Sequence, residues 1–244
     1  MENSFRRKTD SLPTCMSCNS VLYGGFCSNC GQKSTEDLVF SNLFEDFRRR
    51  VRELDHPFVR TALHLTRNPG RLVRAYIRGK RLPYVGPFTY AATTAILVSA
   101  WVGFGGFDMS AGQTPWGGRG DDGASFPTFV FSTFAVLWVA ALVGKLQHTL
   151  FPQEKYSVTE TWVFGLFTFA HLNLLVAFFA SLGAFATPIG LISLGIAHFL
   201  AFDLALAGFY RRAPWRTLPA ALILETVFIA GIFTSGALFR LLGF

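Results

Sequence analysis

Charged residues are scarce in this sequence, and after residue 82 they carry no net charge. Only 15% of the 244 residues are Asp, Glu, Lys or Arg, against about 25% in an ordinary soluble protein. Residues 83–244 hold seven basic and seven acidic side chains, separated by long uncharged stretches. This composition excludes a soluble domain with a polar surface and indicates an integral membrane protein.

Known catalytic motifs are also missing. The sequence has no Gly-x-Ser-x-Gly and no His-Glu-x-x-His, the spacings that position a nucleophile or a catalytic metal. An intramembrane enzyme acting on lipid is therefore the least favoured class, and we expect no catalytic residues. The first eighty residues contain no long apolar run, so we expect no signal peptide and a cytosolic N-terminal part.

Five apolar runs follow residue 83, each close to the roughly 20 residues that a helix needs to cross a bilayer. They cover residues 85–106, 126–148, 161–183, 188–210 and 218–244. Residues 1–82 carry 15 basic and 8 acidic side chains, so the positive-inside rule places them in the cytosol. We predict an all-α polytopic membrane protein with five transmembrane helices, its N-terminus inside and its C-terminus outside.

All four cysteines lie in two Cys-x-x-Cys pairs separated by eight residues: Cys15, Cys18, Cys27 and Cys30. Four thiolates at this spacing are typical of a closed, tetrahedral structural zinc site. A disulfide pair does not suit a reducing cytosol, and iron–sulfur clusters use other spacings. We predict a zinc ribbon over residues 15–34, with Zn²⁺ as a structural cofactor.

Two residues that tolerate a left-handed backbone, Asn19 and Gly31, follow the two cysteine pairs and suit tight turns. Tyr23 and Phe26 are expected to be the only apolar filling of this module. Because so small a segment has little core, metal binding would supply its folding energy.

Residues 38–82 combine eleven basic side chains with four acidic ones, and their apolar residues recur at helical spacing. We predict basic amphipathic helices beside the membrane, the second starting at Pro69 and ending at Gly79. One arrangement places them on the lipid surface; packing against protein remains the alternative, and nucleic acid is not expected. The predicted headgroup contacts are Arg48, Arg49, Arg50, Arg52, Arg74, Lys80 and Arg81.

Four ionisable residues fall inside the last three apolar runs, at overlapping depths: His171, His198, Asp203 and Glu225. A charge at the bilayer centre costs about 2.5–3.5 kcal/mol, so such groups pair, titrate or contact water. They can form a substrate or ion pathway, or hydrogen bonds that hold helices together. Since His198 and Asp203 lie five residues apart, they cannot both point along one narrow line.

Two functions remain open for this architecture, and the first is the one we favour from the sequence. The first is a small transporter or channel, expected to be a homo-oligomer because five helices make a thin pore wall, with the four buried ionisable residues as its pathway. The second is a membrane-anchored module whose zinc ribbon and basic helices recruit a cytosolic protein or sense anionic lipid.

Several runs resemble a known family: Phe26–Lys33, Asp55–Phe58 with Thr61, Arg67–Gly70 and Tyr76–Arg81 with Pro87. It is a bacterial family of uncharacterised membrane proteins in which a zinc ribbon precedes a basic junction and several transmembrane helices. The resemblance covers about residues 15–90 and implies architecture in the bacterial inner membrane, but no activity. Asn19 replaces the family's usual Gly, and Arg74 stands where an acidic residue is commoner.

The predicted divisions of the chain are a flexible N-terminus (1–14), the ribbon (15–34), the basic helices (38–82) and the membrane domain (83–244).

Overall fold

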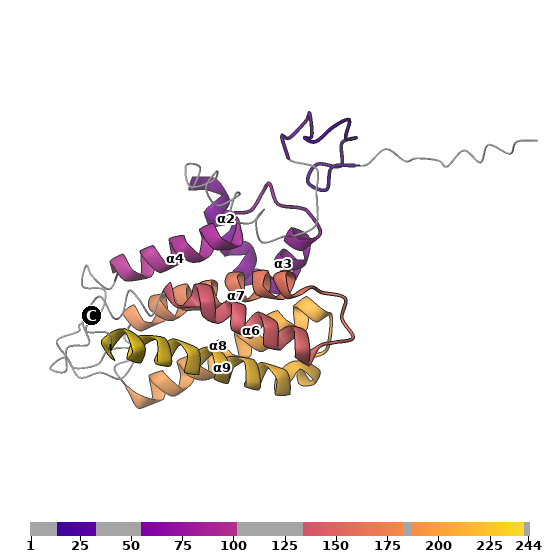
Figure 1. The fold of residues 1–244 in the computed structure, drawn as a ribbon. Helices are drawn as coiled ribbons and strands as arrows, with labels where there is room; N and C mark the ends of the chain where they lie inside the picture. The colour runs from indigo at the N-terminus through magenta and orange to yellow at the C-terminus, as the bar shows by residue number, and fades with distance from the viewer. Residues whose placement is uncertain (1–13, 33–54, 102–133, 183–186, 242–244) are drawn as a thin grey trace, which may run out of the picture.

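The computed structural model describes residues 14–32, 55–101, 134–182 and 187–241 (Figure 1). Within these ranges every regular element is a helix; the cysteine segment has in addition an isolated bridge between Thr14 and Val21 and a bridge residue at Phe26. The helices are α2 (Asp55–Arg67), α3 (Pro69–Ile77), α4 (Pro87–Trp101), α6 (Val136–Leu150), α7 (Val158–Ser181), α8 (Pro188–Tyr210) and α9 (Pro214–Leu241). The all-helical prediction is confirmed for this part of the chain.

Helix α7 lies at the centre of the bundle and contacts α2, α3, α4, α6 and α8 (Figure 1). Every residue from 163 to 172 is buried. Phenylalanine fills this core: the Phe169 ring stacks on Phe228 at 3.7 Å and lies 4.9 Å from Phe202. Much of the unusual content of 27 Phe is explained by flat rings that fill the space between closely packed helices.

Three helices are long and apolar enough to cross a membrane: 158–179, 188–210 and 214–235. Helix α8 also exposes one apolar stripe along its whole length, with residues at steps of three and four: Ile189, Ile192, Ile196, Leu200 and Leu204. Such a stripe is unfavourable in water and suits a hydrocarbon environment. These features indicate that the protein is associated with a membrane.

The helix bounds agree with the predicted runs to different degrees. Helix α8 has the predicted limits, while α7 begins three residues earlier than predicted. Helix α9 begins at Pro214 rather than at 218 and continues through Pro219, which removes only one backbone hydrogen bond. Helices α4 and α6 have 15 residues each; residues 85–86 precede α4 without helical structure, and residues 102–106 and 126–133 of the predicted runs lie outside the described residues. A count of five spans therefore remains a prediction.

Helices α2 and α3 pack against the bundle. Leu72, Val73 and Tyr76 of α3 are buried, and α3 contacts both α7 and α8. A Cβ added at Gly70 would lie 2.3 Å from the Phe209 backbone nitrogen, so the two helices touch at backbone level. Both helices therefore pack against protein, and their contact with the lipid surface stays a prediction. As predicted, Pro69 begins α3 and Gly79 follows its end, with φ 105°.

Candidate metal centre and buried polar contacts

The two cysteine pairs fold into equivalent turns. The Cys15 N–H donates to the Ser20 carbonyl, and the Asn19 N–H donates back to the Cys15 carbonyl. Cys27 makes the same two bonds, with Gln32 and Gly31. Asn19 and Gly31 occupy corresponding positions and are left-handed, with φ 62° and 72°. The prediction of tight turns at these residues is confirmed.

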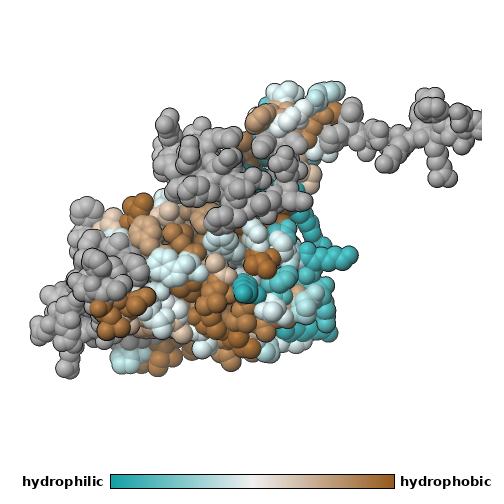
Figure 2. All heavy atoms as spheres, in the orientation of Figure 1, coloured by the Kyte–Doolittle hydropathy of each residue, from teal (hydrophilic) through white to brown (hydrophobic). Residues whose placement is uncertain are grey.

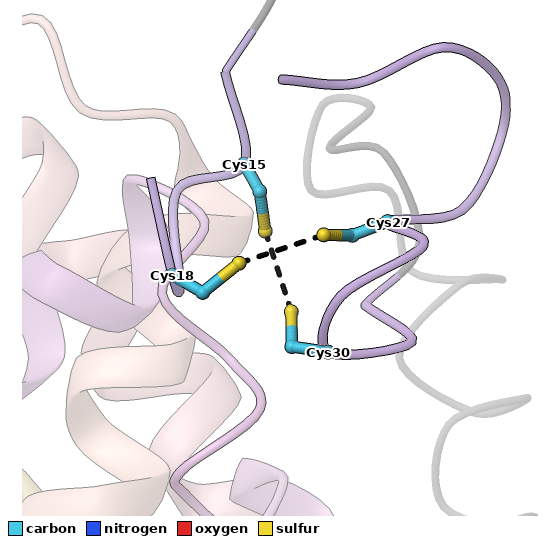
Figure 3. A group of neighbouring side chains, drawn as sticks. All are labelled: Cys15, Cys18, Cys27 and Cys30. Atoms are coloured by element: carbon cyan, nitrogen blue, oxygen red, sulfur yellow. Dashed lines mark hydrogen bonds between the residues drawn. The ribbon is translucent and has the colours of Figure 1, made fainter. Parts of the chain in front are cut away.

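These turns aim four sulfur atoms at one point (Figure 3). The Sγ atoms all lie within 4.8 Å of one another, with Cys15 3.5 Å from Cys30 and Cys18 3.5 Å from Cys27. Four thiolates at about 2.3 Å from a tetrahedral Zn²⁺ are separated from each other by about 3.8 Å. The set therefore fits a metal ion, and all four ligand positions are filled by protein.

Hydrogen bonding around Cys18 favours the ligand form of its side chain. Contacts with the Ser20 side chain and backbone lower the pKa of the Cys18 thiol to about 6. In Cys30, a backbone hydrogen bond with Gln32 lowers the pKa, but burial and the neighbouring thiols outweigh it and raise the pKa to about 12. Because the thiolate is the form that binds metal, a bound cation would displace protons from this set.

The predicted apolar filling of this module is wrong. Tyr23 is 82% exposed and Phe26 57% exposed, whereas Cys15, Leu22 and Cys27 are buried. The sulfur atoms themselves occupy the interior, so the aromatic rings remain outside.

Gln32 joins the cysteine module (residues 14–32) to the helices. Its side chain is buried, its Nε2 donates to the Gly79 carbonyl, and its Oε1 accepts from the Leu82 N–H at 3.3 Å. Gly79 and Leu82 lie in the α3–α4 connection, so the module is fixed where the chain enters α4. A sequence offers no signal for this contact, because its partners are 47 and 50 residues away.

One end of the bundle is hydrophilic (Figure 2). The α6–α7 and α8–α9 connections meet here, where Phe151 stacks on Tyr210 at 4.1 Å and Arg212 binds Glu154 at 3.0 Å. We call this end, which includes Arg211, Arg212 and Arg216 of the α8–α9 connection and the start of α9, the basic end. The sides of the bundle in the same view are largely hydrophobic, as expected for helices that face lipid.

The predicted headgroup residues are only partly described. Arg74 and Arg81 are half-buried and Lys80 is exposed, and the Arg81 guanidinium lies 5.8 Å from the centre of the Tyr76 ring. Arg48, Arg49, Arg50 and Arg52 lie outside the described residues.

The four predicted pathway residues are divided among three separate contacts. His171 Nδ1 lies 2.8 Å from the Tyr90 hydroxyl, and its Nε2 lies 3.0 Å from the Thr66 hydroxyl. The imidazole thus links α7 to α4 and α2. Its role as a helix connector is visible, and neither Tyr90 nor Thr66 was singled out from the sequence.

The other three residues connect α8 and α9. His198 Nδ1 lies 3.3 Å from Glu225 Oε1, and the Thr217 hydroxyl donates to Asp203 Oδ1 at 2.7 Å. Asp203 and Glu225 are both buried. His198 and Asp203 pair with different residues, as their spacing requires, and only the His198–Glu225 pair brings two of the predicted residues together.

A family model matches residues 55–98, which include α2, α3 and most of α4. That family is described as "Protein of unknown function (DUF3667)". The match agrees with the predicted resemblance to an uncharacterised family and brings no activity with it. No curated protein and no solved structure matches the chain.

Proposed function

We propose that this chain is a five-span protein of the bacterial inner membrane, whose cysteine module binds zinc and recruits a cytosolic protein. The module and the basic helices face the cytosol, as the excess of positive charge before residue 83 favours. The spans anchor the module and hold it at the membrane surface.

The observation that carries this proposal is the contact of Gln32 with the α3–α4 connection. A metal module attached by a free linker would not need a buried amide with both ends bonded. Because α3 packs on α7 and α8, a partner bound to the module would be held in a defined orientation to the membrane helices.

Zinc has a structural role in this proposal. With four thiolates around the ion, no ligand position is open for substrate. Cys15, Cys18, Cys27 and Cys30 would hold the metal, and the ordered module would present its exposed residues, Tyr23 and Phe26 among them. Exposed aromatic residues are common at protein interfaces.

The test compares capture of cytosolic proteins by the full chain, in detergent, in three forms: zinc-loaded, chelated, and carrying Gln32→Ala. Gln153→Ala is the matched control, since Gln153 is exposed. We expect one partner that binds the zinc-loaded protein, is lost on chelation, and binds Gln153→Ala normally. Equal capture by the chelated and loaded proteins would reject the proposal.

A second measurement tests the coupling itself. The Leu82 N–H donates to Gln32, so its hydrogen exchange should be slow in the loaded protein and faster after chelation or in Gln32→Ala. Unchanged exchange would show that the module does not dock through Gln32.

Transport is the second candidate, favoured by the His198–Glu225 pair. Two ionisable groups 3.3 Å apart inside an apolar bundle are expensive to retain without a use. Proton or cation flux into proteoliposomes should then fall in Glu225→Gln. Flux equal to that of the wild type would remove this pair from any pathway.

A further inference from the structure

Two arginines of α3 and the residue that caps its end, Arg78, share one side of the helix near the end of α8. Arg71, Arg74 and Arg78 follow at steps of three and four residues, which places them on neighbouring turns. Arg211, directly after α8, completes the group. Burial and the positive charge of Arg211 lower the pKa of Arg74, Tyr156 opposes them, and Arg78 and Arg71 add smaller lowering effects. Arg74 is therefore close enough to feel the positive charge of each of the other three arginines.

No carboxylate neutralises this group in the described part of the chain. Arg74 Nη1 is buried and has no hydrogen-bond partner among the described residues. A buried donor without a partner is unfavourable, and more so when it is charged. Folding thus brings like charges together and leaves one of their donors unsatisfied, which an anion would correct.

The neighbouring Arg212 has the opposite environment. Its Nη2 and Nε lie 3.0 and 3.2 Å from Glu154 Oε1, and its guanidinium lies 5.5 Å from the centre of the Phe151 ring. Consecutive arginines at the same helix end therefore differ: Arg212 is paired with an acid, whereas Arg211 lies near another cation, Arg74.

The backbone at Arg211 gives a separate indication. Its φ is +53°, a left-handed conformation that usually belongs to Gly after a helix. A long side chain in this conformation is strained, and such strain is commonly retained at functional positions. Gly would relieve the strain but would remove the fourth guanidinium.

We propose that Arg71, Arg74, Arg78 and Arg211 form a binding site for a phosphate group. A guanidinium presents two parallel N–H donors that match two phosphate oxygens, so several of them can surround one phosphate. The group lies at the basic end, where headgroups of a bilayer around α7, α8 and α9 would lie. The phosphate of an anionic lipid and a free phosphate share this chemistry. The site does not depend on the role proposed for the cysteine module.

The test uses the full metal-loaded protein in dodecyl maltoside, which contains no phosphate. Inorganic phosphate, short-chain phosphatidylglycerol and short-chain phosphatidylcholine are titrated separately at fixed salt, and the dissociation constant is measured by calorimetry. We expect phosphatidylglycerol to bind more tightly than phosphatidylcholine. Tight binding of phosphatidylglycerol alone identifies lipid as the source, and equal binding of inorganic phosphate identifies a free phosphate; both results support the site.

Arg74→Gln and Arg211→Gln should each weaken binding about tenfold or more, the loss expected for one charged hydrogen bond. Arg74→Lys keeps the charge but not the paired donors, so its affinity should be intermediate. Arg216→Gln is the control, because Arg216 is an exposed cation at the same end. Absence of binding by the wild type, unchanged affinity of both Gln variants, or an equal loss in Arg216→Gln would overturn the proposal.

Thermal unfolding without phosphate separates a ligand site from a structural one. Removing a charge that three neighbouring arginines oppose should leave the melting temperature of Arg74→Gln unchanged or raised. A melting temperature clearly below that of the wild type would make Arg74 a structural residue and overturn the assignment.

Discussion

The close contact between α3 and α8 makes Gly70→Ala the sharpest structural prediction. A Cβ at this position would meet three backbone atoms, the Phe209 nitrogen at 2.3 Å, the Gly208 carbonyl carbon at 2.4 Å and the Ala205 oxygen at 2.8 Å. Backbone atoms cannot rotate away. Ordinary contact begins at 3.4 Å, so the helices must separate by about 1.1 Å (3.4 − 2.3).

Such a separation loosens the buried contacts of α3, including Leu72, Val73 and Tyr76. Overpacking of this kind costs about 1–3 kcal/mol, and the helix preference of Ala over Gly returns at most about 1 kcal/mol. With backbone on both sides of the clash, we expect a net destabilisation of about 2 kcal/mol. For a chain of this size that corresponds to a melting temperature about 4–8 °C lower.

Two controls share the chemical change without the clash. At Gly195 a Cβ meets nothing within 4 Å, so Gly195→Ala should be neutral or slightly stabilising. At Gly208 the nearest atom is the Gly70 Cα at 3.6 Å, so Gly208→Ala should be tolerated. All variants are compared by thermal unfolding in one detergent. Should Gly70→Ala melt at or above the wild type, α3 does not pack on α8 as described.

Three further outcomes are expected. Acidification should release the metal, because protons compete for the thiolates as the pH falls through their pKa values. The Cys27→Ser variant should lose the metal already at neutral pH. Full metal occupancy in the acidified protein or in the variant would contradict the corresponding prediction. Thr217→Val should lower the free energy of unfolding by about 1–3 kcal/mol, since it leaves the buried Asp203 carboxylate without its donor. Asp203→Asn should change stability little. Equal melting temperatures of Thr217→Val and the wild type would argue against the hydrogen bond. Glu225→Gln should be as stable as the wild type or more stable, because the amide can keep the contact with His198 and removes the cost of burying a carboxylate, and a large loss of stability would show that the His198 pair holds α8 to α9.

The features predicted correctly depend on neighbours in sequence. Pro69 and Gly79 determine where α3 starts and ends through their own backbone preferences, and Asn19 and Gly31 determine the turns of the cysteine module in the same way. The membrane character of the later half likewise follows from composition.

The features that were missed depend on residues far apart in sequence. The sequence indicates the depth of His171 along a helix but not its partners, and Thr66 is 105 residues away. It likewise gives no reason to connect Gln32 with Gly79. Tyr23 and Phe26 were assigned to an interior because aromatic rings usually fill one, yet here sulfur atoms gather at the centre and leave no room for them.

The position of Gln32 ahead of its partners sets an order of events on the ribosome. Gly79 is translated 47 residues after Gln32, an interval of about 2–9 s at ordinary bacterial synthesis rates. All four cysteines are therefore part of the growing chain before Gly79, whose carbonyl accepts the Gln32 amide, is synthesised. A metal ion that the four thiolates bind would therefore reach the module before the α3–α4 connection that holds it is complete.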